Sequence, residues 1–223
     1  ILQKYTKNLL LDAQNGCHDP IINRDRELKK IAEILSRKSK PNVMVQGESG
    51  VGKTVLIQNL ASEIHKGKIV DTLREASLLE IDSRALHSGA SYKGEAEDRL
   101  QQLFLEVKTL VKPIVFIDDF HVLFQDAVTS QGVLNVFKSE LNKGEVIIIG
   151  ATTPDNYRKH IACDDALDRR FESVTLDEPD QETAFRILKS VGLTYTEHHG
   201  LDIDDDTLRE SIRLSKRYLK EKR

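Results

Sequence analysis

The chain has 223 residues, of which 39% are hydrophobic and 31% charged, and this composition supports one large globular domain with a smaller appendage rather than a disordered segment. Its 33 Lys and Arg against 36 Asp and Glu give a net charge of −3, which argues against a protein that coats nucleic acid or anionic membrane. Two cysteines exclude a disulfide scaffold and fit a reducing, cytoplasmic compartment, and no apolar run approaches the ~20 residues of a membrane span.

Taken in chain order, the apolar pattern begins with helices and then alternates. Leu2, Tyr5 and Leu9 share one face of an opening helix, and a second amphipathic helix covers residues 28–35. Strands are expected at residues 43–45, 78–81, 113–117 and 146–149, with helices at 56–64, 96–107 and 133–141. Continuous apolar strands separated by helices predict an α/β fold with a mostly parallel sheet covered on both faces, which makes three αβα layers.

After Pro179 the pattern becomes purely helical, with apolar stripes over residues 184–191 and 208–219. We therefore expect two units, a nucleotide-binding one over residues 1–178 and a partial helical subdomain over residues 179–223. Because the chain opens on Ile1 and the helical subdomain looks unfinished, we expect it to be a piece of a longer protein.

The segment after the first expected strand fits the phosphate-loop pattern G-x-x-x-x-G-K-[ST] at every fixed position. It consists of Gly47, Glu48, Ser49, Gly50, Val51, Gly52, Lys53 and Thr54. Glycines let the backbone N–H groups approach a phosphate closely. We expect Lys53 to contact the β- and γ-phosphates of a nucleoside triphosphate and the Thr54 hydroxyl to bind Mg²⁺. An ordinary glycine-rich turn would not explain the Lys-Thr pair.

Two carboxylates follow the strand at residues 113–117. In an open α/β sheet, the carboxyl ends of the strands are where ligands bind, so Asp118 and Asp119 are expected beside the phosphate loop. Asp118 is the candidate for the metal side, and Asp119 is the candidate for orienting and deprotonating the attacking water. The alternative is a solvated Asp-Asp turn.

These residues resemble the first ATPase module of the ClpA/ClpB/ClpC-type AAA+ unfoldases, from about Tyr5 to Tyr218. The matching stretches are residues 18–25, 89–95, 149–158, 166–171 and 198–203. The resemblance implies a P-loop NTPase fold with a helical lid, ATP or ADP with Mg²⁺ as ligands, a homo-hexameric ring, and unfolded polypeptide as the substrate. It does not imply a membrane or nucleic acid as a partner.

The resemblance also implies roles for residues outside the phosphate loop. Asp118 holds Mg²⁺ through water, and Thr153 is the sensor of the γ-phosphate. Ile21 and Ile22 line the adenine pocket, which Ile187 closes from the lid.

Two further roles concern neighbouring subunits and the substrate. Arg169 and Arg170 resemble arginine fingers that reach a neighbouring subunit's nucleotide, although a surface cation pair is the alternative. Tyr92 resembles the aromatic residue of a pore loop that grips the polypeptide, and the alternative is a tyrosine folded back on its own domain.

The chain departs from the family pattern at two informative positions. Asp119 stands where the family has Glu, and a shorter carboxylate leaves two readings open: slow hydrolysis or a bridging water. Asn23 stands where the family has Gly. The sequence therefore predicts an ATP-hydrolysing protein-remodelling module, with a slowly hydrolysing ATP-binding switch as the alternative. A nucleic-acid-remodelling ATPase is a third reading, against which the near-balanced charge argues.

Overall fold

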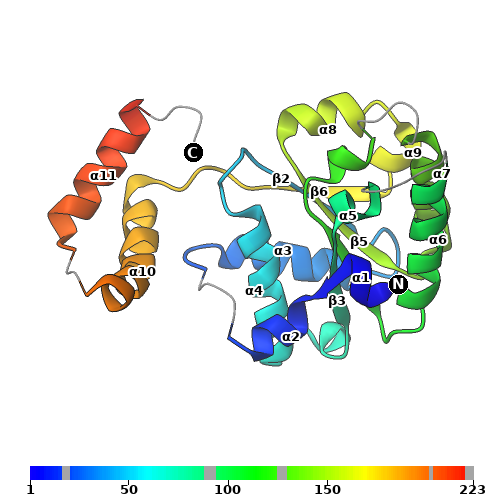
Figure 1. Ribbon diagram of the computed structural model, residues 1–223, viewed down its shortest axis with the longest axis horizontal. Coiled ribbons are helices and arrows are strands. Elements are labelled where there is room, and N and C mark those ends of the chain that lie inside the picture. The colour runs from blue at the N-terminus through cyan, green and yellow to red at the C-terminus, as the bar shows by residue number, and fades with distance from the viewer. Residues whose placement is uncertain (17–20, 88–93, 125–129, 201–202, 219–223) are drawn as a thin grey trace.

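A computed structural model describes residues 1–16, 21–87, 94–124, 130–200 and 203–218 (Figure 1). Within these ranges six strands form one sheet, in the order β1-β3-β4-β5-β2-β6. The strands are β1 (Thr6–Asn8), β2 (Asn42–Gln46), β3 (Ser77–Ile81), β4 (Pro113–Ile117), β5 (Ile147–Thr152) and β6 (Phe171–Thr175). Every neighbouring pair is parallel except β1 with β3, which confirms the predicted mostly parallel sheet.

Helices alternate with these strands along the chain. The α-helices are α1 (Leu2–Tyr5), α2 (Leu9–Gln14), α3 (Asp25–Leu35), α4 (Lys53–His65), α5 (Ser83–His87), α6 (Glu95–Val107), α7 (Ser130–Lys143), α8 (Pro154–His160), α9 (Asp165–Asp168), α10 (Gln181–His199) and α11 (Asp205–Tyr218). The described part of the chain also contains the short 3₁₀ helices η1 (Asp71–Leu73) and η2 (Phe120–Phe124). None of the described helices is long and apolar enough to cross a membrane.

The core consists of two apolar clusters, one on each face of the sheet. Val43 and Val45 of β2 belong to the cluster formed with α3 and α4, whereas Met44 belongs to the cluster formed with α6 and α7. Ile114 and Val115 of β4 divide between the two clusters in the same way. Because the central strands are buried on both sides, they appear in the sequence as continuous apolar runs. This arrangement confirms the three predicted layers.

The two outer strands differ from the sequence-based expectations. The opening helix expected over Leu2 to Leu9 is wrong, because residues 6–8 form β1 and pair antiparallel with β3. These three residues are polar, so they carry no apolar run that would indicate a strand. β6 was not expected either, since its burial is intermittent along a five-residue segment, yet it pairs with β2 over its whole length.

The last two helices form a separate pair. In Figure 1, α10 and α11 lie side by side, at a distance from the helices that cover the sheet, and they pack against each other. The chain reaches them through residues 176–180, which leave the sheet after β6. The helices expected after Pro179 are therefore present.

Candidate functional site

The phosphate loop connects β2 to α4, and three of its glycines are required by its geometry. Gly50 and Gly52 have φ values of +85° and +94°, a left-handed conformation that favours glycine. A Cβ on Gly47 would lie 2.9 Å from the carbonyl oxygen of Leu176 and 2.8 Å from Val51 Cγ2. The backbone therefore folds as closely as a phosphate cradle requires.

Lys53 is the first residue of α4, and its side chain turns back into the loop. Only 8% of the residue is exposed, and its Nζ donates to the carbonyl oxygens of Gly47 and Glu48, both at 2.9 Å. Burial lowers the pKa of Lys53, and the nearby Asp118, Asp119 and Glu48 oppose that change. The loop thus holds a desolvated cation, the kind of group that binds phosphate strongly.

Thr54 and Asp118 lie against each other beside this cation. The Thr54 hydroxyl donates to Asp118 Oδ2 at 2.5 Å, and Asp118 Oδ1 accepts the backbone N–H of Asp119 at 2.9 Å. Mg²⁺ is usually bound by one or two such oxygens together with substrate phosphates. Within the described ranges, no cluster of three or more His, Cys, Asp or Glu side chains would hold a metal on its own. The residues present therefore fit Mg²⁺ that is bound jointly with a nucleotide.

Asp119 occupies a strained turn after β4. Its φ of +48° is unusual for a residue other than glycine, and its carbonyl oxygen accepts the N–H of Val122 at 2.8 Å. The next residue, Phe120, is fully buried and packs edge-to-face on Phe137 and Phe171, with ring centroids 5.4 and 5.5 Å apart. This buried ring anchors the turn, so the core holds the backbone of Asp119 in place.

The end of β5 lies between the loop and this turn. The Thr152 carbonyl accepts the N–H of Gly47 at 3.1 Å, and its buried hydroxyl lies 3.1 Å from His121 Nδ1. Burial lowers the pKa of His121, against the opposing charge of Asp119. Thr153 caps α8 by accepting a backbone N–H from the first turn of that helix at 3.3 Å. Sequence reasoning did not assign Thr152 or His121 to the site, although Thr152 directly precedes Thr153 and His121 is two residues after Asp119.

Arg169 and Arg170 lie at the other end of the strands. They precede β6, whose first residue pairs with Asn42 at the start of β2, whereas the phosphate loop follows Gln46 at the end of β2. The Arg169 side chain is 77% exposed and lies 3.6 Å from Asp165, and Arg170 Nη1 donates to the Leu141 carbonyl at 3.4 Å. The structure thus does not bring either arginine to the phosphate loop of its own chain.

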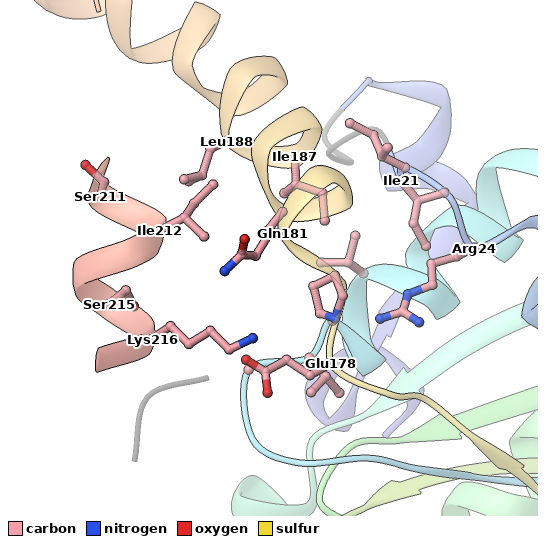
Figure 2. Close-up of a pocket in the computed structure, with 17 residues that line it drawn as sticks. Ile21, Arg24, Glu178, Gln181, Ile187, Leu188, Ser211, Ile212, Ser215 and Lys216 are labelled. Carbon is pink, nitrogen blue, oxygen red and sulfur yellow. The ribbon is translucent and has the colours of Figure 1, made fainter. Parts of the chain in front are cut away.

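A cavity of about 920 Å³ opens between the phosphate loop and the lid helices (Figure 2). Ile21, Ile22 and Ile187, the three residues expected at the adenine pocket, all line it together with Gly50 and Gly52. Polar lining residues that sequence reasoning missed are Arg24, Glu178, Gln181, Ser211, Ser215 and Lys216. Only Arg24 could have been found from the sequence, because it lies in the same segment as Ile21. The mostly apolar wall suits the flat faces of a base.

One predicted residue cannot be placed. Tyr92, expected in a pore loop, lies outside the described residues.

Sequence comparison identifies the family. Residues 43–175 match the profile of the "ATPase family associated with various cellular activities (AAA)", and residues 180–223 match an AAA lid domain. The chain belongs to the AAA family of ATPases. The phosphate loop and Asp118 lie within the first match, and Ile187 and Lys216 lie within the second.

Relatives of this AAA chain include bacterial Clp proteins. Chaperone protein ClpB of Nitratidesulfovibrio vulgaris is 42% identical over 221 residues, which cover 98% of this chain and 26% of that protein. The ATP-dependent Clp protease ATP-binding subunit ClpL of Staphylococcus aureus is 36% identical over 223 residues, which cover 98% of this chain and 32% of that protein. The resemblance to Clp-type AAA+ modules is therefore confirmed, and the chain spans about a quarter to a third of these relatives.

Solved structures of yeast Hsp104 have the same fold. The S. cerevisiae Hsp104-ADP complex matches with a TM-score of 0.89 at 34% identity, covering 98% of this chain and 31% of that chain. The S. cerevisiae Hsp104:casein complex matches with a TM-score of 0.86 at 35% identity, covering 98% of this chain and 38% of that chain. The AAA fold predicted from the sequence is confirmed.

Proposed function

We propose that this chain binds and hydrolyses ATP with Mg²⁺ as one module of a Clp-type protein-remodelling chaperone. The observation that carries this proposal is the 2.5 Å contact of Thr54 with Asp118, next to the buried Lys53 of the phosphate loop. These are the hydroxyl, the carboxylate and the cation that a triphosphate and its metal require. The complex of Hsp104 with ADP supports an adenine nucleotide as the ligand.

Each residue then has a definite task in hydrolysis. Lys53 and the loop N–H groups bind the β- and γ-phosphates, and Thr54 and Asp118 would hold Mg²⁺. When bound, Mg²⁺ neutralises charge that develops on the phosphate oxygens. The Asp119 carboxylate orients the attacking water and accepts its proton, and Thr153 senses the γ-phosphate from the start of α8.

The arginines support a site that is shared between copies of the chain. The five residues of β2 separate Arg169 and Arg170 from their own phosphate loop by roughly 13 Å along the strand direction. A guanidinium inserted from a neighbouring copy can contribute ~10³–10⁵ in rate. We therefore propose a ring, a hexamer as in the family, in which Arg169 and Arg170 complete the neighbour's site.

Polypeptide is the proposed substrate of that ring. The complex of Hsp104 with casein supports a protein substrate, and Tyr92 is the residue proposed to grip it. An aromatic ring can pack on many kinds of side chain without reading a sequence.

The deciding experiment measures ATP turnover against protein concentration for the parent, Lys53→Ala and Arg170→Ala. We expect turnover per chain to rise with concentration in the parent, to be lost in Lys53→Ala at all concentrations, and to stay low in Arg170→Ala. Full turnover in dilute monomer, unaffected by Arg170→Ala, would contradict the shared site. A fluorescent adenine nucleotide that does not bind the parent would contradict the whole proposal.

A slowly hydrolysing ATP-binding switch is the second candidate, and Asp119 is the observation that favours it. Its carboxylate is one methylene shorter than the family's Glu, and the Asp119 backbone lies in a turn that a buried aromatic ring anchors. A catalytic group that is misplaced by ~1 Å can cost ~10²-fold in rate. In this reading, ATP binding rather than turnover orders the ring.

A further inference from the structure

The connection between the sheet and the lid runs through residues 176–180. At its start, Leu176 is buried and its N–H donates to the Gln46 carbonyl of β2 at 2.7 Å. At its end, the Asp180 carboxylate caps α10 by accepting the N–H of Thr183 at 2.7 Å. Thr183 is itself buried, although it belongs to the first turn of the lid helix. The connection is thus bonded to β2 at its start and to the first turn of α10 at its end.

Two adjacent residues ahead of α3 hold this connection at two points. Arg24 Nη2 donates to the Asp177 carbonyl at 2.6 Å. Asn23 Nδ2 donates to the Thr183 hydroxyl oxygen at 3.0 Å. Asp177 comes before the turn into α10 and Thr183 comes after it, so the two contacts lie on both sides of this turn. We call this pair of contacts the linker clamp.

The backbone conformation of Asn23 shows that its side chain is not needed for the turn. Its φ is +60°, which glycine adopts at no steric cost and asparagine tolerates better than most residues. A glycine would make the same turn but would reach nothing in the lid. The Asn23 amide therefore adds a contact with α10 that the turn itself does not require.

The linker clamp joins the two walls of the cavity beside the phosphate loop. Ile21 and Ile22 line the cavity from the segment that contains Asn23, and Ile187, one turn beyond Thr183, lines it from α10 (Figure 2). We propose that Asn23 is a positioning residue, whose hydrogen bond to Thr183 holds α10 at the spacing that closes the cavity on an adenine nucleotide. This inference rests on the proposed function, in which a nucleotide occupies the cavity.

The direct test compares Asn23→Gly with Lys40→Gly. Both replace an exposed residue at positive φ, +60° and +53°. Both substitutions therefore raise the conformational entropy of the unfolded chain in the same way. Lys40 precedes β2 and does not line the cavity. We expect Asn23→Gly to weaken ADP binding about three- to tenfold, mainly through faster dissociation, because one hydrogen bond contributes about that much. Lys40→Gly should leave ADP affinity unchanged.

Substitutions of Thr183, whose hydroxyl accepts the hydrogen bond from Asn23, test the same contact without relying on Asn23→Gly alone. Thr183→Val removes the hydroxyl, Thr183→Ser retains it, and only the first should speed ADP dissociation. Thr183→Val also removes the hydroxyl's hydrogen bond to the Asp180 carboxylate. Asn23→Gly should therefore have little further effect in the Thr183→Val background, where its contact is already lost, so the two effects should be non-additive. Additive effects, or an Asn23→Gly chain that releases ADP at the parent rate, would overturn the proposal.

Hydrogen exchange measured without nucleotide tests whether the linker clamp exists, separately from its role in nucleotide binding. Amides in the first turn of α10 should exchange faster in Asn23→Gly than in Lys40→Gly, since the clamp is lost only in the former. Equal exchange in both variants overturns the clamp itself. A parent chain that binds no ADP, with exchange altered as expected, overturns instead the proposed function and the clamp's role in nucleotide binding.

Discussion

The Thr54 hydroxyl and the Asp118 carboxylate lie 2.5 Å apart, although 64 positions separate them in the sequence. Thr54 is in the first turn of α4, and Asp118 follows the last residue of β4. In a parallel sheet, the carboxyl ends of the strands and the amino ends of the following helices share one edge. The fold therefore assembles the two oxygens before any ligand arrives, which is the preorganisation that a metal site needs.

If the Thr54 hydroxyl binds Mg²⁺, removing it should weaken ADP binding mainly when Mg²⁺ is present. Thr54→Val should lower the ratio of ADP affinity with Mg²⁺ to affinity with EDTA by about tenfold or more, a range found for groups that merely orient metal ligands. Thr54→Ser retains the hydroxyl and should keep the ratio. Titration calorimetry in both buffers measures it. An unchanged ratio in Thr54→Val would remove this residue from the metal site.

Asp119 predicts opposite results from two substitutions. Asp119→Glu restores the family's longer carboxylate and should raise the ATP turnover rate, whereas Asp119→Asn removes the proton acceptor and should lower it by about 10²-fold or more. Single-turnover hydrolysis at saturating ATP separates this effect from binding. If both variants turn over ATP at the parent rate, Asp119 does not orient the water, and the switch reading gains support.

The close packing around Gly47 predicts that a larger residue there lowers the stability of the chain. Gly47→Ala places a methyl group 2.9 Å from the Leu176 carbonyl oxygen and should reduce the free energy of unfolding by ~1–3 kcal/mol. Gly192→Ala is the matched control, since a Cβ there meets nothing within 4 Å and lies inside α10. It should increase that free energy by ~0.5–1 kcal/mol. Urea unfolding followed by circular dichroism measures both, and equal effects of the two substitutions would contradict the close packing.

The burial of His121 predicts how the free energy of unfolding changes with pH. Burial lowers its pKa in the folded chain below the ordinary value of 6.5, so between those two values the unfolded chain binds more protons. The stability that neutral His121 provides is therefore present above 6.5 and is lost as the pH falls toward the lowered pKa. Without nucleotide, the free energy of unfolding should fall less steeply in His121→Asn than in the parent between about pH 7.5 and 5.5.

The matched control for this measurement is His65→Asn, because His65 is exposed at the end of α4. Its pH profile should follow that of the parent. Parallel profiles for the parent and His121→Asn would show that burial of the imidazole does not contribute to the pH dependence.

The centre of the fold and the position of the phosphate loop between β2 and α4 could be predicted because both have local signals. A buried parallel strand is a continuous apolar run, and the loop from Gly47 to Thr54 has fixed spacing. The edge strand β1 has neither signal, and the spacing of Leu2, Tyr5 and Leu9 mimics a helix. The contact of Asn23 with Thr183 spans 160 positions, so no local pattern predicts it.

The residues that line the cavity could not be predicted from a local sequence pattern either. Ile21 and Ile187 were expected there only through the family resemblance, because apolar residues at helical spacing do not indicate which of them line a cavity. Lys216 and Glu178 were not expected there at all, since a charged residue in a helix or linker is usually solvated. Their place depends on where the lid helices lie relative to the phosphate loop, which is a tertiary property.

If the arginine pair completes the site of a neighbouring copy, as proposed above, the register of β2 with β6 also restricts how copies of this chain can associate. The nucleotide loop is at one end of these strands and the arginine pair is at the other, so a two-fold symmetric pair would have to bring both ends of each copy into a single interface. A head-to-tail contact needs one end from each copy and leaves a vacant end on each terminal copy. Only closure into a circle occupies every end, and an association that failed to close would continue as a filament.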